Sequence, residues 1–258
     1  MDCIVMILVS LAMAAPSPGG TKPPSIQDIL SQVQTAGRRL NSYQARIEYV
    51  LTQPLLDSRT VRTGAIYYQR STGSSRLRVS MQTIQQDQDK PQSCHEEFIF
   101  DGVWLTHIDY QLMSITKRQM TEPNQPKDAF ELAGSQFPII GFTDINELIG
   151  QFDVRLAGPD PNDRKTGLCQ LEFTSRPGSR YSQQYHRIIF TIQTSSWLPA
   201  KVYAESSEGD LYEVSFLQPR INQALDPGIF DVSPPAHFGP PQIITLEHAR
   251  KDAAPSGD

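Results

Sequence analysis

The sequence predicts a mainly β chain with helices, of the α+β class, with about eleven antiparallel strands, an N-terminal helix and a mid-chain helical insert. Two observations predict this class. Over most of the chain, apolar and polar side chains alternate with a period of two, as half-buried strands require. Turn signals such as Asp101-Gly102 and Glu208-Gly209 separate the alternating runs, and glycine tolerates the positive φ of tight hairpins. The helical period is confined to two regions.

The N-terminal helix is predicted over residues 26–40. Ser25 suits the N-cap position, with Asp28 as the acidic partner of a capping box. Apolar residues then recur at helical spacing, which indicates one amphipathic helix of about four turns. The residues of this stripe are Ile26, Ile29, Leu30, Val33 and Leu40.

The strands are predicted where the period switches to two. Residues 96–119 are a meander of three strands with apolar residues on both faces, which suits a curved sheet that packs on one side and holds an apolar ligand on the other. Prolines interrupt the strands after residue 120, and the helical insert is expected at 128–133 and 144–150, around an apolar loop at 137–142. The expected strands are 43–52, 63–70, 76–82, 96–100, 103–110, 112–119, 152–158, 168–176, 185–193, 200–206 and 211–218.

The first residues are typical of a signal peptide. Residues 3–15 are apolar but too few to span a bilayer, which needs roughly 20. Ala12-Met13-Ala14 provides an A-x-A cleavage site. We therefore expect a signal peptide at 1–15, a linker at 16–25, one domain at 26–238 and a disordered tail at 239–258, in a periplasmic or otherwise exported protein.

No enzyme motif is present in the sequence, and no cofactor or metal site is expected. His95-Glu96-Glu97 and the pair His107 and Asp109 are interpreted as polar strand residues rather than catalytic groups. Cys94 and Cys169 could form a disulfide in an oxidising compartment or remain free thiols. A net charge of −5 without any basic run excludes a nucleic-acid partner.

Three stretches, in this order, resemble the LolA-like family of periplasmic lipoprotein carriers. Residues 64–70 (GAIYYQR) resemble a family strand that begins with Gly and ends with Arg. Residues 100–102 (FDG), followed by Trp104 and a turn before Gln111, are similar to the family's meander. Residues 222–230 (NQALDPGIF), which run into a Pro-Pro pair, resemble its C-terminal signature. The resemblance covers residues 25–238.

The resemblance implies a half-open antiparallel barrel whose concave apolar face is covered by a helical lid, with acyl chains held between them. Arg70 corresponds to the family arginine that is thought to hydrogen-bond the lid in the closed state. The lid residues are expected to include Leu30, Val33, Ile140, Phe142 and Leu148. The lipid-binding residues are expected to be Ile47, Tyr49, Ile66, Tyr68, Val79, Phe98, Phe100, Trp104, Ile108, Ile188, Phe190 and Val214.

The expected function is that of a non-enzymatic exported carrier, a monomer that binds acyl chains of lipid or lipoprotein, with envelope membrane proteins as further partners. Two alternatives stay open from the sequence. One is a lipid-sensing regulatory module on the same fold, and the other is an exported β-rich interaction protein whose apolar residues fill a core and bind no ligand.

Overall fold

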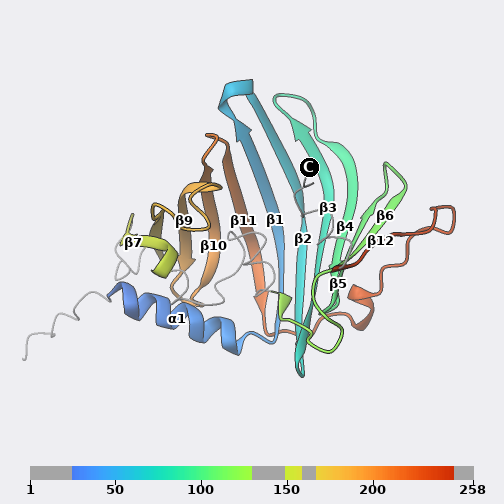
Figure 1. Cartoon of the computed structure of the whole chain (residues 1–258), viewed down its shortest axis with the longest axis horizontal. Coiled ribbons are helices and arrows are strands. Elements are labelled where there is room, and N and C mark those ends of the chain that lie inside the picture. Colours follow the sequence, from blue (N-terminus) through green and yellow to red (C-terminus); the bar gives the residue numbers. More distant parts are fainter. Residues whose placement is uncertain (1–24, 130–148, 159–166, 247–258) are drawn as a thin grey trace, which may run out of the picture.

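A computed structural model describes residues 25–129, 149–158 and 167–246 of the chain. These residues form helix α1, two short 3₁₀ helices and strands of a single sheet (Figure 1). The elements are α1 (Ile26–Arg39), β1 (Ser42–Gln53), η1 (Pro54–Leu56), β2 (Ser58–Ser71), β3 (Ser74–Gln86), β4 (Gln92–Phe100), β5 (Trp104–Asp109), β6 (Ser114–Gln119), β7 (Phe152–Leu156), β8 (Leu168–Ser175), β9 (Tyr185–Gln193), β10 (Leu198–Ser206), β11 (Leu211–Ile221), η2 (Pro227–Phe230) and β12 (Gln242–Ile244).

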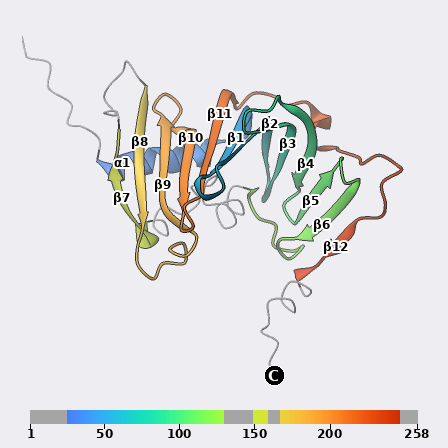
Figure 2. The ribbon, with the colours of Figure 1, turned by 90° about the horizontal axis from the view of Figure 1, so that it is seen from above.

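The sheet has twelve strands in the order β12-β6-β5-β4-β3-β2-β1-β11-β10-β9-β8-β7, and it does not close on itself. Neighbours pair antiparallel except β12, which lies parallel to β6. Seen from above, the sheet is bent, and β5, β6 and β12 leave the line of the other strands (Figure 2). The chain therefore forms a mainly β, open and curved sheet, as predicted in outline.

The predicted strands correspond to β1–β11, and the twelfth lies where a disordered tail was expected. That expectation for 239–258 is wrong at Gln242–Ile244, because these residues find hydrogen-bond partners on the free edge of β6. The predicted signal peptide at 1–15 and most of the predicted helical insert lie outside the described residues. No helix in the described ranges is long and apolar enough to cross a bilayer.

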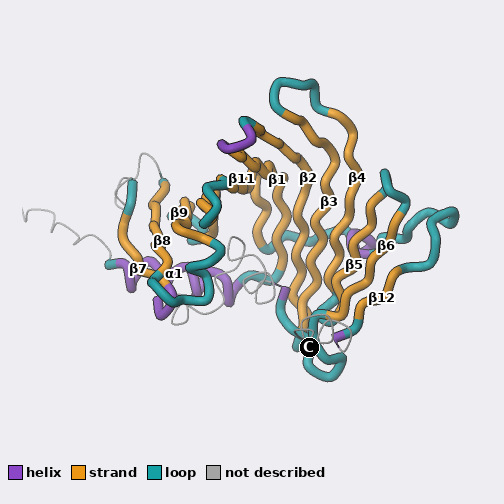
Figure 3. Tube along the Cα trace, turned by 45° about the horizontal axis from the view of Figure 1, so that its top comes forward, coloured by secondary structure: helices purple, strands orange, loops and turns teal. Residues whose placement is uncertain are grey.

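Helix α1 begins with the predicted capping box. The backbone N–H of Asp28 donates to Ser25 Oγ at 3.2 Å, and the backbone N–H of Ser25 donates to Asp28 Oδ2 at 2.9 Å. The helix buries Ile29, Leu30 and Val33 against one end of the sheet. It lies across the strands between β7 and β11 and leaves β2–β6 uncovered (Figures 1 and 3).

The two faces of the sheet differ in what covers them. We call the face against α1 the helix face; on β1 it carries Tyr43, Ala45 and Ile47, all buried. The opposite, outer face carries Gln44 and Arg46 on the same strand. Residues paired across a sheet point to the same side. The strand register therefore shows, for all the remaining strands, which side chains lie on the helix face and which on the outer face.

Residues 222–246, here called the C-terminal arm, cover part of the outer face. Arg78 Nη1 donates to the Ile229 carbonyl at 2.7 Å, and the Arg76 guanidinium lies 4.6 Å from the centre of the buried Phe230 ring. Further along, the Phe238 ring packs edge-on against Tyr110. The arm then ends in β12 at the sheet edge.

The two cysteines that the structure describes do not form a disulfide. Cys94 lies in β4 and Cys169 in β8, and both are buried and free. Six strands lie between β4 and β8 in the sheet. Burial raises the pKa of Cys169 to about 11, so its thiol stays protonated at neutral pH.

Candidate ligand-binding site

The described residues of the helix face form two apolar cores. The first lies under α1 and contains Phe173, Ile188 and Phe190 of β8 and β9, together with Leu30 and Val33 of the helix. These side chains are at most 2% exposed, so this half of the sheet is filled by the protein itself. The second core lies mainly on β1, β2 and β4, and it comprises Leu40, Tyr43, Ala45, Ile47, Ile66, Tyr68, Phe100 and Ala129.

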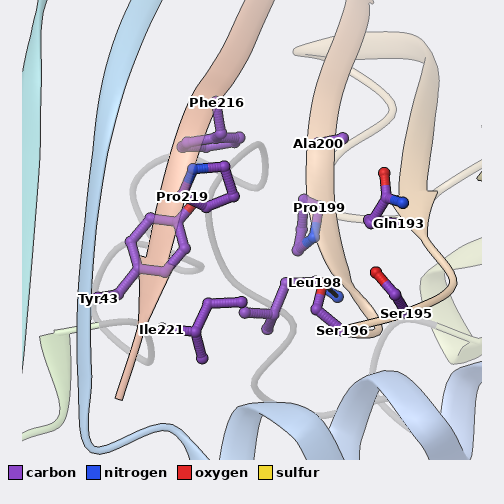
Figure 4. Close-up of a pocket in the computed structure, with 10 residues that line it drawn as sticks. All are labelled: Tyr43, Gln193, Ser195, Ser196, Leu198, Pro199, Ala200, Phe216, Pro219 and Ile221. Atoms are coloured by element: carbon purple, nitrogen blue, oxygen red, sulfur yellow. Dashed lines mark hydrogen bonds between the residues drawn. The ribbon is translucent and has the colours of Figure 1, made fainter. Parts of the chain in front are cut away.

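A cavity of about 310 Å³ lies where these two cores meet (Figure 4). Phe216 of β11 packs against both cores and forms part of its wall. Ligand pockets typically measure about 300–1,000 Å³, so this cavity is at the lower end of that range. Its lining residues are Tyr43, Gln193, Ser195, Ser196, Leu198, Pro199, Ala200, Phe216, Pro219 and Ile221.

The cavity exists because β10 and β11 separate at one end. The two strands pair from Lys201 to Glu205 on β10, but not at the residues before Lys201. In that region β10 remains paired with β9, whereas β11 remains paired with β1 as far as Ile221. Each strand carries a proline, Pro199 or Pro219, which has no N–H to donate across the gap. The helix-face side chains around this separation therefore border an open space.

The chemistry of the cavity is apolar on one side and hydrogen-bonding on the other. Tyr43 and Phe216 pack edge to face, with ring centroids 6.4 Å apart, and form the apolar side with Leu198 and Ile221. Among the residues that the structure describes, those that line the cavity are all uncharged at neutral pH. Burial raises the pKa of the Tyr43 phenol well above its ordinary value, so this hydroxyl also stays neutral.

Arg70 joins the end of α1 to the sheet beside the second core. Its Nη1 donates to the Arg38 carbonyl at 2.5 Å and its Nη2 to the Gly37 carbonyl at 3.1 Å. The last carbonyls of a helix lack partners within the helix and carry partial negative charge, so a guanidinium caps them favourably. Arg70 Nε also donates to the Tyr68 hydroxyl, which in turn donates to Asp128.

Replacing Arg70 with Met is expected to loosen the last turn of α1. The variant loses hydrogen bonds from a charged donor, which are worth about 1.5–3 kcal/mol. Amide hydrogen exchange in residues 34–40 should therefore become faster while the sheet stays protected. The matched control is Arg46→Met, which removes an exposed arginine from the outer face of β1. Equal exchange rates in the two variants would contradict the capping role.

The structure places the predicted lipid-binding residues on two different faces. Ten of them lie on the helix face, but none of the twelve lines the cavity itself. Trp104 and Ile108 lie on the outer face, because Leu105 pairs with Phe100 and Ile108 pairs with Glu97, whose side chain points away from the helix face. There the Lys117 ammonium lies over the Trp104 ring at 5.3 Å.

Some of the predicted lid residues lie in the described part of the chain and others do not. Leu30 and Val33 belong to the filled core under α1. Ile140, Phe142 and Leu148 lie outside the described residues.

The cavity residues were missed because they occur at strand ends and in a turn. One signal that could have found them is the pair of prolines, Pro199 and Pro219, that directly flank two predicted strands, since proline interrupts a ladder of hydrogen bonds.

A polar cluster lies on the helix face of β2, β4 and β5. The Arg62 guanidinium pairs with the Glu96 carboxylate, and His107 Nε2 lies 3.4 Å from Glu96 Oε2. The His107 ring stacks on Phe98, with centroids 4.3 Å apart. Asp109 instead accepts backbone N–H groups in the following turn, so it does not pair with His107. Within the described ranges, no group of three or more His, Cys, Asp or Glu side chains is placed to hold a metal ion.

No protein-family model matches the chain, and no curated protein matches it by sequence. Solved structures do resemble it. An uncharacterised conserved protein from Thermus thermophilus is 12% identical, with a TM-score of 0.49, over 85% of this chain and 98% of the other. The MucA/MucB complex of Pseudomonas aeruginosa gives 19% identity and a TM-score of 0.45, over 80% of this chain and 60% of the other.

The LolA superfamily protein NE2245 from Nitrosomonas europaea is 12% identical, with a TM-score of 0.35, over 79% of this chain and 96% of the other. A structure of the LolA superfamily is thus among those similar to this chain.

Proposed function

We propose that this chain is an exported carrier that binds an acyl chain of a lipid or lipoprotein in the cavity between β10 and β11. The observation that carries the proposal is the apolar wall of that cavity, which Tyr43, Leu198, Phe216 and Ile221 form among the described residues. Such a surface gives water few partners. It is suited to a hydrocarbon chain.

The energetics of acyl binding need only an apolar surface shielded from water. Each methylene that leaves water contributes about 0.8 kcal/mol. Tyr43 belongs to the second core, Phe216 packs against it, and both line the cavity. An acyl chain in the cavity therefore contacts apolar side chains of that core. The volume of about 310 Å³ suits a single slender ligand better than a bulky one.

Binding, rather than catalysis, is the function that these side chains support. General acid–base chemistry is most often carried out by His, Glu, Asp or Lys, and none of the described residues that line the cavity is of these types. The titratable cluster of Arg62, Glu96 and His107 lies on strands β2, β4 and β5, whereas the cavity is bordered by β1, β10 and β11. A carrier needs no reacting group, only reversible burial of its cargo.

Native mass spectrometry of protein purified from its host envelope tests this proposal. We expect an added mass that is removed by extraction with organic solvent and restored by adding back the extracted lipid. The uncharged fluorescent probe N-phenyl-1-naphthylamine should bind the extracted protein and be displaced by the same lipid. Protein that carries no lipid and also fails to bind the probe would contradict acyl binding.

A further inference from the structure

Exposed apolar side chains are gathered in two hairpin tips, residues 54–57 between β1 and β2 and residues 110–113 between β5 and β6. Apolar residues scattered singly over a surface need no explanation, but these occur as adjacent pairs at two turns. The exposed fractions are 88% for Leu55, 69% for Leu56, 74% for Leu112 and 55% for Met113. The two tips therefore present an apolar surface to water.

Both tips lie at the same end of the sheet. From β1 to β5 neighbouring strands pair antiparallel, so β1, β3 and β5 run in one direction and the turns that follow them lie together at one end. This end is at the top of Figure 1, away from α1. The turn after β3, residues 87–91, lies between the tips and is polar. Adjacent strands are about 4.8 Å apart, so the tips are separated by up to roughly 19 Å.

Hydrogen bonds hold both tips in shape. Beside the first tip, the Asp87 carboxylate accepts the backbone N–H of Arg59 at 2.7 Å, which ties the start of β2 to the neighbouring turn. In the second tip, Asp109 Oδ1 accepts the backbone N–H groups of Gln111 and Leu112, both at 2.8 Å. Because these turns are already ordered, burying their apolar side chains costs little further conformational entropy.

We propose that the two hairpin tips dock the protein on the surface of a zwitterionic lipid bilayer. A bilayer offers apolar interior at every lateral position, so it can receive both tips at once. A protein interface instead buries one continuous apolar core, and here the polar turn at 87–91 separates the two apolar pairs. That turn suits the head-group layer, where polar side chains stay hydrated while apolar ones enter the acyl boundary.

The charges beside the tips determine which lipid surface fits. Residues 54–59 and 87–91 carry Asp57, Asp87 and Asp89 against Arg59 and Lys90, and residues 110–113 carry no charge. Anionic lipids attract clusters of Lys and Arg, and this end of the sheet has a small excess of acidic residues. The attraction is therefore apolar and needs no anionic lipid.

Flotation of the full chain with phosphatidylcholine vesicles tests the docking. The double variant Leu55→Ser with Leu112→Ser removes one leucine from each tip, and it should bind at least roughly tenfold more weakly because those side chains no longer leave water. The matched control, Leu156→Ser with Leu217→Ser, removes two leucines of other strands that are 42% and 40% exposed, and it should bind within about twofold of wild type. Adding phosphatidylglycerol to the vesicles should not strengthen binding of the wild-type protein.

The variant Leu112→Trp reports directly on the second tip. Its added fluorescence should shift to shorter wavelength with vesicles and be quenched by brominated phosphatidylcholine. The wild-type protein, with Trp104 and Trp197, gives the baseline, and Leu156→Trp is the control at the opposite end of the sheet.

Binding that is lost in the tip variant alone, together with quenching of Leu112→Trp, supports the proposal. It is overturned if the wild-type protein does not float with the vesicles, if both double variants bind equally, or if binding requires phosphatidylglycerol. It also fails if sedimentation velocity without lipid shows that the tips join two copies of the chain while vesicle binding is unaffected by their loss. None of these results bears on acyl binding, because the cavity lies at the other end of the sheet, where β1 begins.

Discussion

Replacing Arg78 with Met is expected to lower the free energy of unfolding by about 3–5 kcal/mol, because it leaves a buried carboxylate without its cation. The Glu97 side chain is 1% exposed, and Arg78 Nε and Nη2 each donate to one of its oxygens at 2.8 Å. The same arginine holds the C-terminal arm through the Ile229 carbonyl. Urea unfolding followed by far-ultraviolet circular dichroism measures the loss.

Arg176→Met is the matched control for this stability change. It breaks an ion pair with Asp153 in which the two side chains are 45% and 72% exposed. Pairs of that kind contribute about 0–1 kcal/mol, since water and salt screen them. A double variant, Arg78→Met with Glu97→Met, should recover part of the lost stability because no unpaired charge remains. Equal losses in the two single variants would contradict the buried pair.

The pH dependence of stability gives an independent check on Glu97. Burial alone would raise the pKa of this carboxyl group, but hydrogen bonds from Arg78, His95 and Ser80 outweigh burial and lower it below its ordinary value. A carboxylate with a lowered pKa stabilises the fold above its unfolded pKa, about 4.3, and this stabilisation is lost as the pH falls through the lower, folded value. Between pH 5 and 2 the Glu97→Gln variant should therefore lose less stability than the wild-type protein.

Replacing Ala200 with Trp is expected to abolish probe and lipid binding, the largest functional effect that we predict. Ala200 lines the cavity at the point where β10 and β11 separate (Figure 4). An indole at this position extends into a space of about 310 Å³ and occupies the volume that the acyl chain needs. The space already exists, so the fold should tolerate the larger side chain. Titration with N-phenyl-1-naphthylamine measures the loss.

Leu217→Trp is the control for this variant. Leu217 lies in the neighbouring strand β11, and its side chain points to the outer face and is 40% exposed. It therefore adds the same indole on the side of the sheet away from the cavity, and binding should stay within about twofold of wild type. Unfolding midpoints must be comparable for both variants. Retained binding in a folded Ala200→Trp protein would show that the ligand lies elsewhere.

Alternation along the chain predicted much of the fold. Because the side-chain period of a strand is two, runs such as Tyr43, Ala45 and Ile47 identify both the strand and the face that it buries. The capping box of Ser25 and Asp28 likewise marked the start of α1. These features depend on neighbours in sequence, and a local pattern is sufficient to predict them.

The features that were missed depend on which strands meet in space. Trp104 and Ile108 were assigned to the ligand face because alternation gives two faces without saying which one lies against α1; only the pairing of Leu105 with Phe100 decides it. The segment 242–244 was taken for a tail because three residues carry no periodic pattern, yet they pair with β6.

The cavity was missed for a similar reason. β10 and β11 are consecutive in the chain. At one end of the sheet they separate, because β10 remains paired with β9 and β11 remains paired with β1. Ile188 and Phe190, two of the residues that were expected to hold lipid, belong to the core beneath α1. Composition cannot separate a filled core from a ligand site, since both need the same side chains.

Anomalous scattering from a brominated acyl chain tests the central claim most directly. Bound lipid would first be extracted from the protein. The protein would then be loaded with a monoacylglycerol that is brominated near the end of its acyl chain, and the complex would be crystallised. Bromine peaks beside Tyr43, Leu198 and Phe216 are the result that we predict. Bromine bound at another surface, or an ordered protein that holds no bromine at saturating ligand, would contradict a binding site between β10 and β11.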